Sequence, residues 1–206
     1  MEGGALRLPP DDFAQRDLPT QILRAGTELY RVTRAGRKEA PPPFRPLPEE
    51  EVPGHHRFHS PSGLYRVAYF GLSSEAAFVE AHLRGSRHPK LLPQEPDIHL
   101  LTFELKADLP VGLLADHALP VLGATTGSVT GPYAHSQAWG EATSQHPAKP
   151  SGLIYPSARA SHLRCLALFD DRVEEVPENR GSQHLRLDQD PLRQWARDYR
   201  IGWSGR

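Results

Sequence analysis

Cysteine is almost absent from this sequence, since Cys165 is the only one among 206 residues. A single cysteine excludes an intramolecular disulfide and a Cys-rich metal site, and it suits a reducing compartment. The sequence also lacks any run near the roughly 18 apolar residues of a membrane span. Its N-terminus has no basic start followed by an apolar run, which a secretory signal requires. We therefore expect a cytoplasmic protein that makes no contact with membranes.

An excess of charge of either sign is missing as well. Lys and Arg total 24 and Asp and Glu total 25, which gives a formal net charge of -1. This balance leaves no basic surface for nucleic acid, so we expect no direct nucleic-acid partner. A chain of this length fits one domain, in which roughly 70% of the unfolded surface becomes buried.

Proline, in contrast, is abundant, with 21 residues, many of them clustered. Residues 40–54 (APPPFRPLPEEEVPG) exclude a regular element, because each proline lacks an N–H and restricts the residue before it. We predict a long loop there, and loops of this length are commonly functional. The chain is therefore divided into an N-terminal arm over residues 1–25, with room for a short helix, and a single domain over 26–206.

The distribution of apolar residues predicts five strands and three helices. β-Branched and aromatic residues favour strands, whereas capping residues followed by apolar stripes favour helices. The strands are expected at 26–34, 64–71, 98–105, 151–157 and 164–171, the helices at 73–84, 132–146 and 190–200, and a Gly/Thr/Ser-rich loop at 123–131. Asp190 and Pro191 suit the N-cap and first position of the last helix. Because strands and helices do not alternate strictly, we predict an α+β fold, with helices flanking a mixed, mostly antiparallel sheet.

The predicted helix at 73–84 carries a carboxylate among apolar residues. Glu80 lies close in sequence to Ala76, Ala77, Val79 and Leu83, on or beside the face that the helix should bury. A buried carboxylate costs several kcal/mol unless it is paired or hydrogen-bonded. Considered alone, Glu80 fits a functional role and a solvated helix position about equally well.

Four short motifs accompany this helix. They are LYR at 29–31, RF at 57–58 followed by a Pro/Gly loop and a strand tyrosine, AAFVE at 76–80, and GLIYPSAR at 152–159 followed by CLALF at 165–169. Each motif alone is weak, but their joint order and spacing resemble the RES-domain family, which is named for an arginine, a glutamate and a serine. The resemblance runs from about Tyr30 to Phe169, roughly two thirds of the chain.

The resemblance implies a set of site residues. The catalytic residues that it implies are Glu80, Arg57, Tyr69 and Ser157, and the residues that it places against the substrate are Arg31, Tyr30, Tyr65 and Arg159. The family's first arginine falls on Arg31 and its loop arginine on Arg57. Tyr65 competes with Tyr69 for the family's tyrosine, and the spacing to Glu80 favours Tyr69.

The resemblance also implies an activity and a partner. The family is similar in fold to ADP-ribosyltransferases, and its members degrade NAD⁺ by water or by phosphate. Many are toxins neutralised by an Xre-type helix-turn-helix antitoxin. NAD⁺ is then the substrate, with no further cofactor. A transferase that places ADP-ribose on a protein and a non-catalytic NAD-binding module stay open as alternatives, and so does a homodimer.

The chemistry of NAD⁺ agrees with these residue types. Loss of neutral nicotinamide leaves an oxocarbenium-like ribose, which a carboxylate such as Glu80 can stabilise. Guanidinium forks suit a diphosphate better than lysine does, and a tyrosine ring offers a face to the nicotinamide. Considered singly, however, Arg57 fits a surface ion pair, Tyr69 a core position and Ser157 a turn.

Two further residue types have simpler explanations. His55, His56 and His59 invite a zinc site, but Gly54 and Pro61 oppose a helix there and no HExxH glutamate accompanies them, so we predict no metal site. Cys165 lies in an apolar strand, where a free cysteine is normally a small buried hydrophobe.

Overall fold

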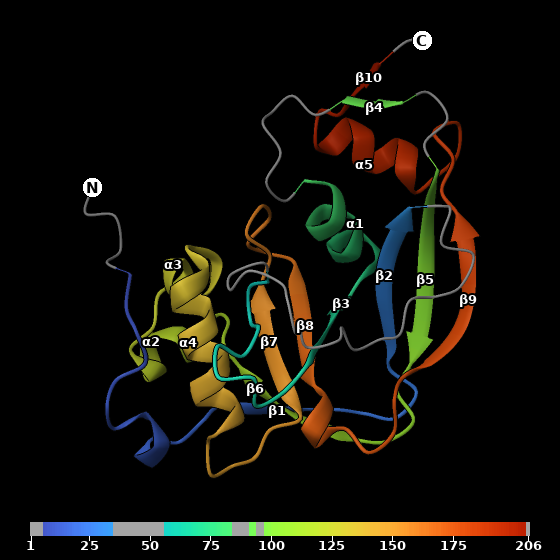
Figure 1. Cartoon of the computed structure of the whole chain (residues 1–206). Coiled ribbons are helices and arrows are strands. Elements are labelled where there is room, and N and C mark those ends of the chain that lie inside the picture. Colours follow the sequence, from blue (N-terminus) through green and yellow to red (C-terminus); the bar gives the residue numbers. More distant parts are fainter. Residues whose placement is uncertain (1–5, 35–55, 84–90, 94–96, 205–206) are drawn as a thin grey trace.

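An eight-stranded mixed sheet forms the centre of the computed structural model, which describes residues 6–34, 56–83, 91–93 and 97–204 (Figure 1). The strand order is β1-β6-β7-β8-β3-β2-β5-β9. β6 and β7 are parallel, and the other neighbours are antiparallel. Together with the helices, this sheet confirms the predicted α+β class. The strands span Thr20–Leu23 (β1), Glu28–Arg34 (β2), Val67–Gly71 (β3), Ile98–Glu104 (β5), Leu109–Leu113 (β6), Gly152–Pro156 (β7), Arg164–Phe169 (β8) and Glu178–His184 (β9).

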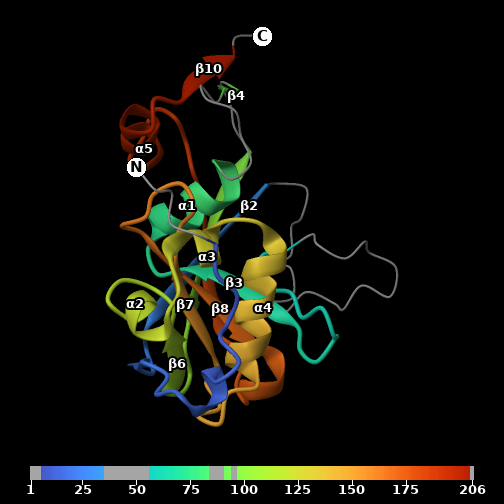
Figure 2. The same ribbon diagram turned by 90° about the vertical axis from the view of Figure 1, so that its left-hand side faces the viewer.

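The helices cover one face of this sheet. α1 (Ser74–His82) lies beside β2 and β3, and α4 (Tyr133–Ser144) runs alongside β7 (Figures 1 and 2). α5 (Leu192–Asp198) packs Trp195 onto Phe78 of α1, with ring centroids 5.0 Å apart. Two shorter helices, α2 (Ala118–Leu122) and α3 (Thr126–Thr130), precede α4, and a small parallel pair of strands, β4 (Leu91–Pro93) and β10 (Gly202–Ser204), lies near α5.

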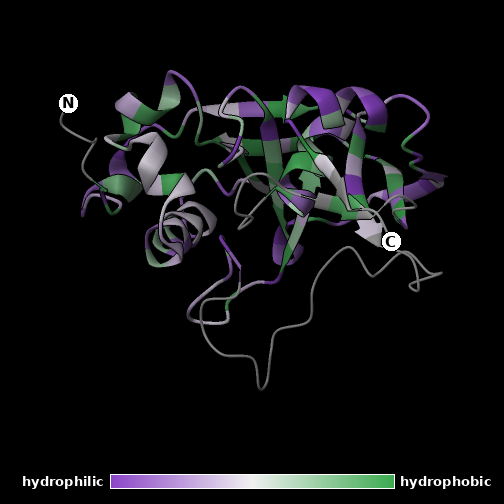
Figure 3. Ribbon diagram, turned by 90° about the horizontal axis from the view of Figure 1, so that it is seen from above, coloured by the Kyte–Doolittle hydropathy of each residue, from purple (hydrophilic) through white to green (hydrophobic). Residues whose placement is uncertain are grey.

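The opposite face of the sheet carries a second apolar core, built almost wholly from strand residues. Leu23 of β1 and Leu109 of β6 belong to the same buried cluster as Leu29 of β2 and Phe103 of β5. These strands are far apart in the strand order, so one buried cluster extends across this face from β1 to β5. Seen from above, hydrophobic residues appear both on strands in the middle of the molecule and on the helices (Figure 3).

The elements with strong sequence signals appear where they were predicted. The five predicted strands correspond to β2, β3, β5, β7 and β8, and the three predicted helices correspond to α1, α4 and α5. Ser73 is the N-cap of α1 and accepts a hydrogen bond from Ala76 N–H at 3.1 Å, as its place in the sequence suggests. α5 differs in detail, because Pro191 rather than Asp190 occupies its N-cap.

Several elements were not predicted. The loop expected at 123–131 contains α3, which begins with a capping box between Thr125 and Ser128. Residues 20–23 of the predicted arm form the edge strand β1, and Phe13 and Leu18 beside it are buried. β9 has no apolar alternation, because all its residues are exposed.

The predicted loop at 40–54 lies outside the described residues. No helix within the described ranges is long and apolar enough to cross a membrane.

Candidate active site

A cleft opens where the pairing between β2 and β3 stops. The described parts of these strands pair at one position, where Tyr30 lies opposite Gly71. If the antiparallel ladder continued, Arg31 would face Phe70 and Val32 would face Tyr69. These four residues line the cleft instead, which encloses about 590 Å³ including its open mouth.

Gly71 allows α1 to begin close to the end of β3. A Cβ at this position would lie 2.4 Å from Ala77 N and 2.6 Å from Ser73 O, which no side chain tolerates. The turn is therefore tight, and α1 returns along the cleft wall. Ala77, Glu80 and Ala81 line the cleft from this helix, as their spacing of three and four residues on one helix face allows.

The Glu80 carboxylate is anchored by the chain that follows β7. Its Oε1 accepts hydrogen bonds from Ser157 Oγ at 2.7 Å and from the Ala158 N–H at 3.1 Å. Among the described residues, no hydrogen bond reaches Oε2. Two donors on one oxygen fix the carboxylate and leave its second oxygen able to contact a ligand.

Ser157 is itself held in one orientation. Its side chain is 1% exposed, and its Oγ accepts a hydrogen bond from Arg159 N–H at 3.3 Å while donating to Glu80. Its backbone N–H donates to Leu163 O at 3.0 Å, which closes the loop after β7. The hydroxyl is thus part of the support for Glu80 rather than a free nucleophile.

Tyr69 lies on the β3 side of the cleft. Its hydroxyl accepts a hydrogen bond from the Phe58 N–H at 2.9 Å, and its ring centroid lies 6.2 Å from that of His56, another cleft residue. The phenol therefore joins β3 to the segment before it, while the ring remains part of the cleft wall.

Arg31 and Tyr30 form the β2 side of the cleft. Arg31 Cζ lies 5.7 Å from the centroid of the Phe70 ring, a cation–π contact across the opened ladder. The Tyr30 hydroxyl donates a hydrogen bond to Glu28, and this bond together with burial raises the pKa of the phenol. Arg31 brings a positive charge to a cleft whose other wall carries Glu80.

The structure does not bring every predicted residue to this cleft. The Arg57 guanidinium is 4% exposed and donates through one nitrogen to Val129 O at 3.0 Å and Gly131 O at 3.3 Å. It also lies over the Tyr133 ring, with 5.8 Å from Cζ to the centroid. Contrary to the prediction, Arg57 joins its own loop to α3 and α4 instead of lining the cleft. Because its side chain is buried, Arg57 does not fit the simpler interpretation as half of a surface ion pair either.

Tyr65 and Arg159 also lie away from the cleft lining. Tyr65 is 2% exposed, packs on Phe169 and donates to Phe58 O at 3.1 Å. Tyr65 is therefore a core residue, and burial raises the pKa of its phenol. The choice of Tyr69 over Tyr65 agrees with this geometry. Arg159 is exposed beside the Ser157 loop.

Two cleft residues were missed in the sequence. His56 was considered only as a metal ligand, and Tyr155 only as part of a strand, yet both line the cleft. Tyr155 lies within the GLIYPSAR motif, two residues before Ser157. His56 directly precedes the RF motif at 57–58, so a motif that began one residue earlier would have included it.

Cys165 behaves as predicted. It is 1% exposed in β8, and burial raises the pKa of its thiol, with the Glu80 charge acting in the same direction. A thiol with a raised pKa is a poor nucleophile, so the chemistry of this site does not depend on it.

Comparisons with known proteins cover most of the chain. The model of the RES domain matches residues 28–190, which include β2 through β9. A chain of the crystal structure of the M. tuberculosis MbcT–MbcA toxin–antitoxin complex has a similar fold, with a TM-score of 0.56 and 19% sequence identity over 85% of this chain and 90% of that chain. No curated protein matches the sequence.

Proposed function

Since the chain belongs to the RES domain family, we propose that it cleaves the nicotinamide–ribose bond of NAD⁺. The observation that supports this proposal most directly is the Glu80 carboxylate, which is held on one oxygen by Ser157 and Ala158 at the wall of the cleft. NAD⁺ serves as the substrate, and no other cofactor takes part.

The proposed reaction needs little acid catalysis. Nicotinamide leaves as a neutral molecule, so the enzyme has to stabilise the positive charge that develops on the ribose. A fixed carboxylate does this without reorganising during the reaction. The two hydrogen bonds to Oε1 hold Glu80 in place, and Oε2 then faces the ribose carbon or grips a ribose hydroxyl.

The remaining cleft residues position the substrate. The Tyr69 ring offers an aromatic face to the nicotinamide, and the Arg31 guanidinium supplies a fork of donors for the diphosphate. With Arg57 held on the carbonyls of Val129 and Gly131, Arg31 is the cation that lines the cleft among the described residues. Tyr30 adjoins it on β2.

We also propose that the protein is the toxin of a toxin–antitoxin pair. The fold is shared with a chain of a toxin–antitoxin complex, and depletion of NAD⁺ would arrest growth. The partner in this proposal is an antitoxin of the Xre helix-turn-helix type that blocks access to the cleft.

One experiment tests the activity. Purified protein is incubated with NAD⁺, with and without phosphate, and the products are identified by mass spectrometry. Free ADP-ribose would identify water as the acceptor, and ADP-ribose-1″-phosphate would identify phosphate. Nicotinamide release only after addition of a protein acceptor would favour the ADP-ribosyltransferase alternative. NAD⁺ binding without nicotinamide release in all mixtures would overturn the proposal of an enzyme.

A further inference from the structure

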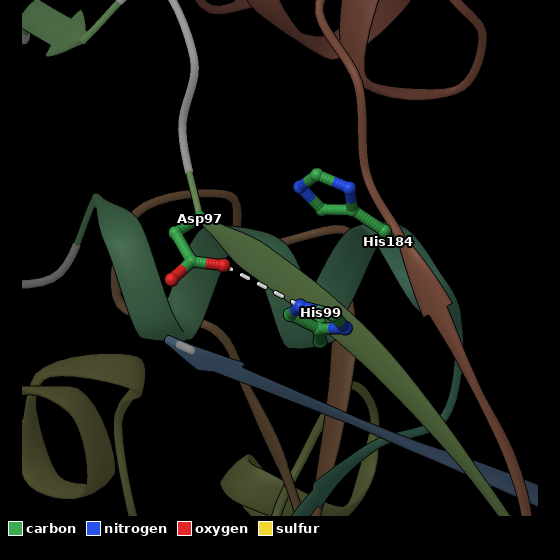
Figure 4. Close-up of side chains that lie close together, drawn as sticks. All are labelled: Asp97, His99 and His184. Atoms are coloured by element: carbon green, nitrogen blue, oxygen red, sulfur yellow. Dashed lines mark ion pairs between the residues drawn. The ribbon is translucent and has the colours of Figure 1, made fainter. Parts of the chain in front are cut away.

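A cluster of three metal-binding side chains lies at the edge of the sheet, outside the cleft. Asp97 precedes β5, His99 is in β5 and His184 ends β9 (Figure 4). One donor atom from each residue lies within 4.8 Å of the other two. None of these residues lines the cleft described above.

The backbone places these side chains together. His99 lies directly opposite His184 in the antiparallel β5–β9 pair. The next pair along is hydrogen-bonded, since Leu185 N–H donates to Ile98 O at 2.8 Å. His99 and His184 therefore form a non-hydrogen-bonded pair, in which side chains come closest. Asp97 precedes His99 by two residues, so the two side chains share one side of the strand.

The side chains already lie side by side. The two imidazole rings are stacked, with centroids 4.9 Å apart and an interplanar angle of 17°. Asp97 Oδ1 lies 3.4 Å from His99 Nε2, and the other ring nitrogen, His99 Nδ1, lies 3.2 Å from Ser182 Oγ. With its proton on Nδ1, directed at Ser182, the neutral ring presents the lone pair of Nε2 to the side where Asp97 lies. Metal-bound histidines are commonly held in this way through their second nitrogen.

We propose that Asp97, His99 and His184 form a binding site for a first-row transition-metal ion, with Zn²⁺ as the representative ion. Two imidazoles and one carboxylate are ligands that Zn²⁺ accepts, with a fourth position left for water. Tetrahedral ligands at Zn²⁺ distances lie about 3.4 Å apart, so the three groups have to close by little more than 1 Å, and the stacked rings have to rotate until their lone pairs converge. Asp97 and His184 are exposed, so this adjustment takes place at the protein surface and requires no repacking of the core.

The site has a structural consequence. β9 is an edge strand whose residues are all exposed, so little apolar burial holds it on β5. A metal bound by His184 from β9 and by Asp97 and His99 from β5 would fasten the two strands together. This inference is independent of the proposed NAD⁺ chemistry.

Titration calorimetry with Zn²⁺ on the tag-free full chain tests the site. We expect one ion per chain, with a Kd on the order of micromolar, and binding weaker by about 10-fold or more in His184→Ala and in Asp97→Asn. His117→Ala is the matched control, because His117 is an exposed histidine on α2's N-terminal side and should leave binding unchanged. Hydrogen exchange of the β9 amides should slow on addition of Zn²⁺ in the wild type and in the control.

The Asp97→Asn variant keeps the shape of the side chain, so a folding defect in His184→Ala does not prevent the test. Equal Zn²⁺ affinity in the wild type and in both site variants would overturn the proposal. Absence of binding up to millimolar Zn²⁺, or β9 exchange that does not respond to the metal, would overturn it too.

Discussion

Ser157 Oγ donates a 2.7 Å hydrogen bond to Glu80 Oε1 across 77 residues of sequence. The bond joins α1, which follows β3, to the loop that follows β7. Because the Ala158 N–H donates to the same oxygen, the carboxylate is fixed by both a side chain and the backbone. This pair connects the two residues that the sequence resemblance assigns as the family's glutamate and serine. Through this bond Ser157 can act on the site although only Glu80 of the two lines the cleft.

Replacement of Glu80 tests the role of the carboxylate. Glu80→Gln keeps the size of the side chain and an oxygen that accepts from Ser157, but it removes the negative charge. We expect NAD⁺ turnover to fall by a factor on the order of 10²–10³, the usual effect of losing one electrostatic stabiliser. Nicotinamide release measured by chromatography gives the rate. Glu75→Gln, on the same helix, is the control, and wild-type turnover in Glu80→Gln would exclude the proposed role.

Replacement of Ser157 tests whether the hydroxyl acts through Glu80. Ser157→Ala removes one of the two hydrogen bonds on Oε1, and hydrogen bonds to charged groups contribute about 1.5–3 kcal/mol. We expect kcat to fall by about 10- to 100-fold, with a smaller change in KM. In the Glu80→Gln background the same substitution should have little further effect, since coupled residues are not additive. Fully additive losses would assign Ser157 a separate role in contacting the substrate.

Much of the fold could be predicted because its central segments carry strong local signals. Ser73 before an alanine-rich stretch marks α1, and the apolar run of residues 164–169 marks β8. β9 could not be found, since an exposed edge strand needs no apolar alternation. α3 was hidden by its Gly, Thr and Ser content, which is also typical of loops, although Thr125 and Ser128 form the capping box that starts it.

The sequence predicted which residues belong to the site better than it predicted where each side chain lies. The motifs identified Glu80, Ser157, Tyr69 and Arg31, which the fold brings to one region. The motifs did not show that Arg31 lines the cleft, whereas Arg57 holds the loop beside it. That distinction for Arg57 depends on carbonyl groups of α3 and the segment after it, more than 70 residues away. A pattern within a single segment carries no information about such long-range partners.

The edge of the sheet should lose stability in acid. Glu104 of β5 has a lowered pKa because it accepts hydrogen bonds from Arg180 and Lys106, and Glu178 of β9 has a lowered pKa chiefly through Lys106. A carboxyl group whose pKa is lower in the folded state stabilises the fold above its unfolded pKa, and this contribution disappears as the pH falls through the folded pKa.

Urea unfolding from about pH 7 down to about pH 3 measures this effect. Arg180→Gln should flatten the acid dependence, since Arg180 no longer holds the Glu104 carboxylate in its charged form. Salt should reduce the difference between the variant and the wild type, because Arg180 and Glu178 are exposed and Glu104 is partly exposed. Identical acid dependence in both proteins at low salt would show that this ion cluster does not hold β9.

Tyr69 combines a structural hydroxyl with a proposed substrate-binding ring, and two substitutions separate them. Tyr69→Phe keeps the ring but leaves the Phe58 N–H without its acceptor, which should cost about 1–3 kcal/mol. We expect a Tm lower by several degrees and nearly unchanged KM for NAD⁺. Tyr69→Leu removes the aromatic face as well and should raise KM. Similar KM values in the two variants would mean that the ring does not hold the nicotinamide.

Substitution by lysine should chiefly raise KM at Arg31 and chiefly lower Tm at Arg57. Arg31 lines the cleft, so Arg31→Lys replaces a two-pronged donor with a point charge and should raise KM for NAD⁺ about 10-fold with little effect on Tm. Arg57→Lys removes the guanidinium that reaches Val129 O and Gly131 O. Loss of these charge-assisted bonds should cost about 1.5–3 kcal/mol of stability, while KM of the folded protein stays close to that of the wild type. Calorimetric Tm and steady-state kinetics, measured well below the lower Tm, separate the two effects. A raised KM in Arg57→Lys without a fall in Tm would return Arg57 to the substrate and contradict its assignment as the support of the loop.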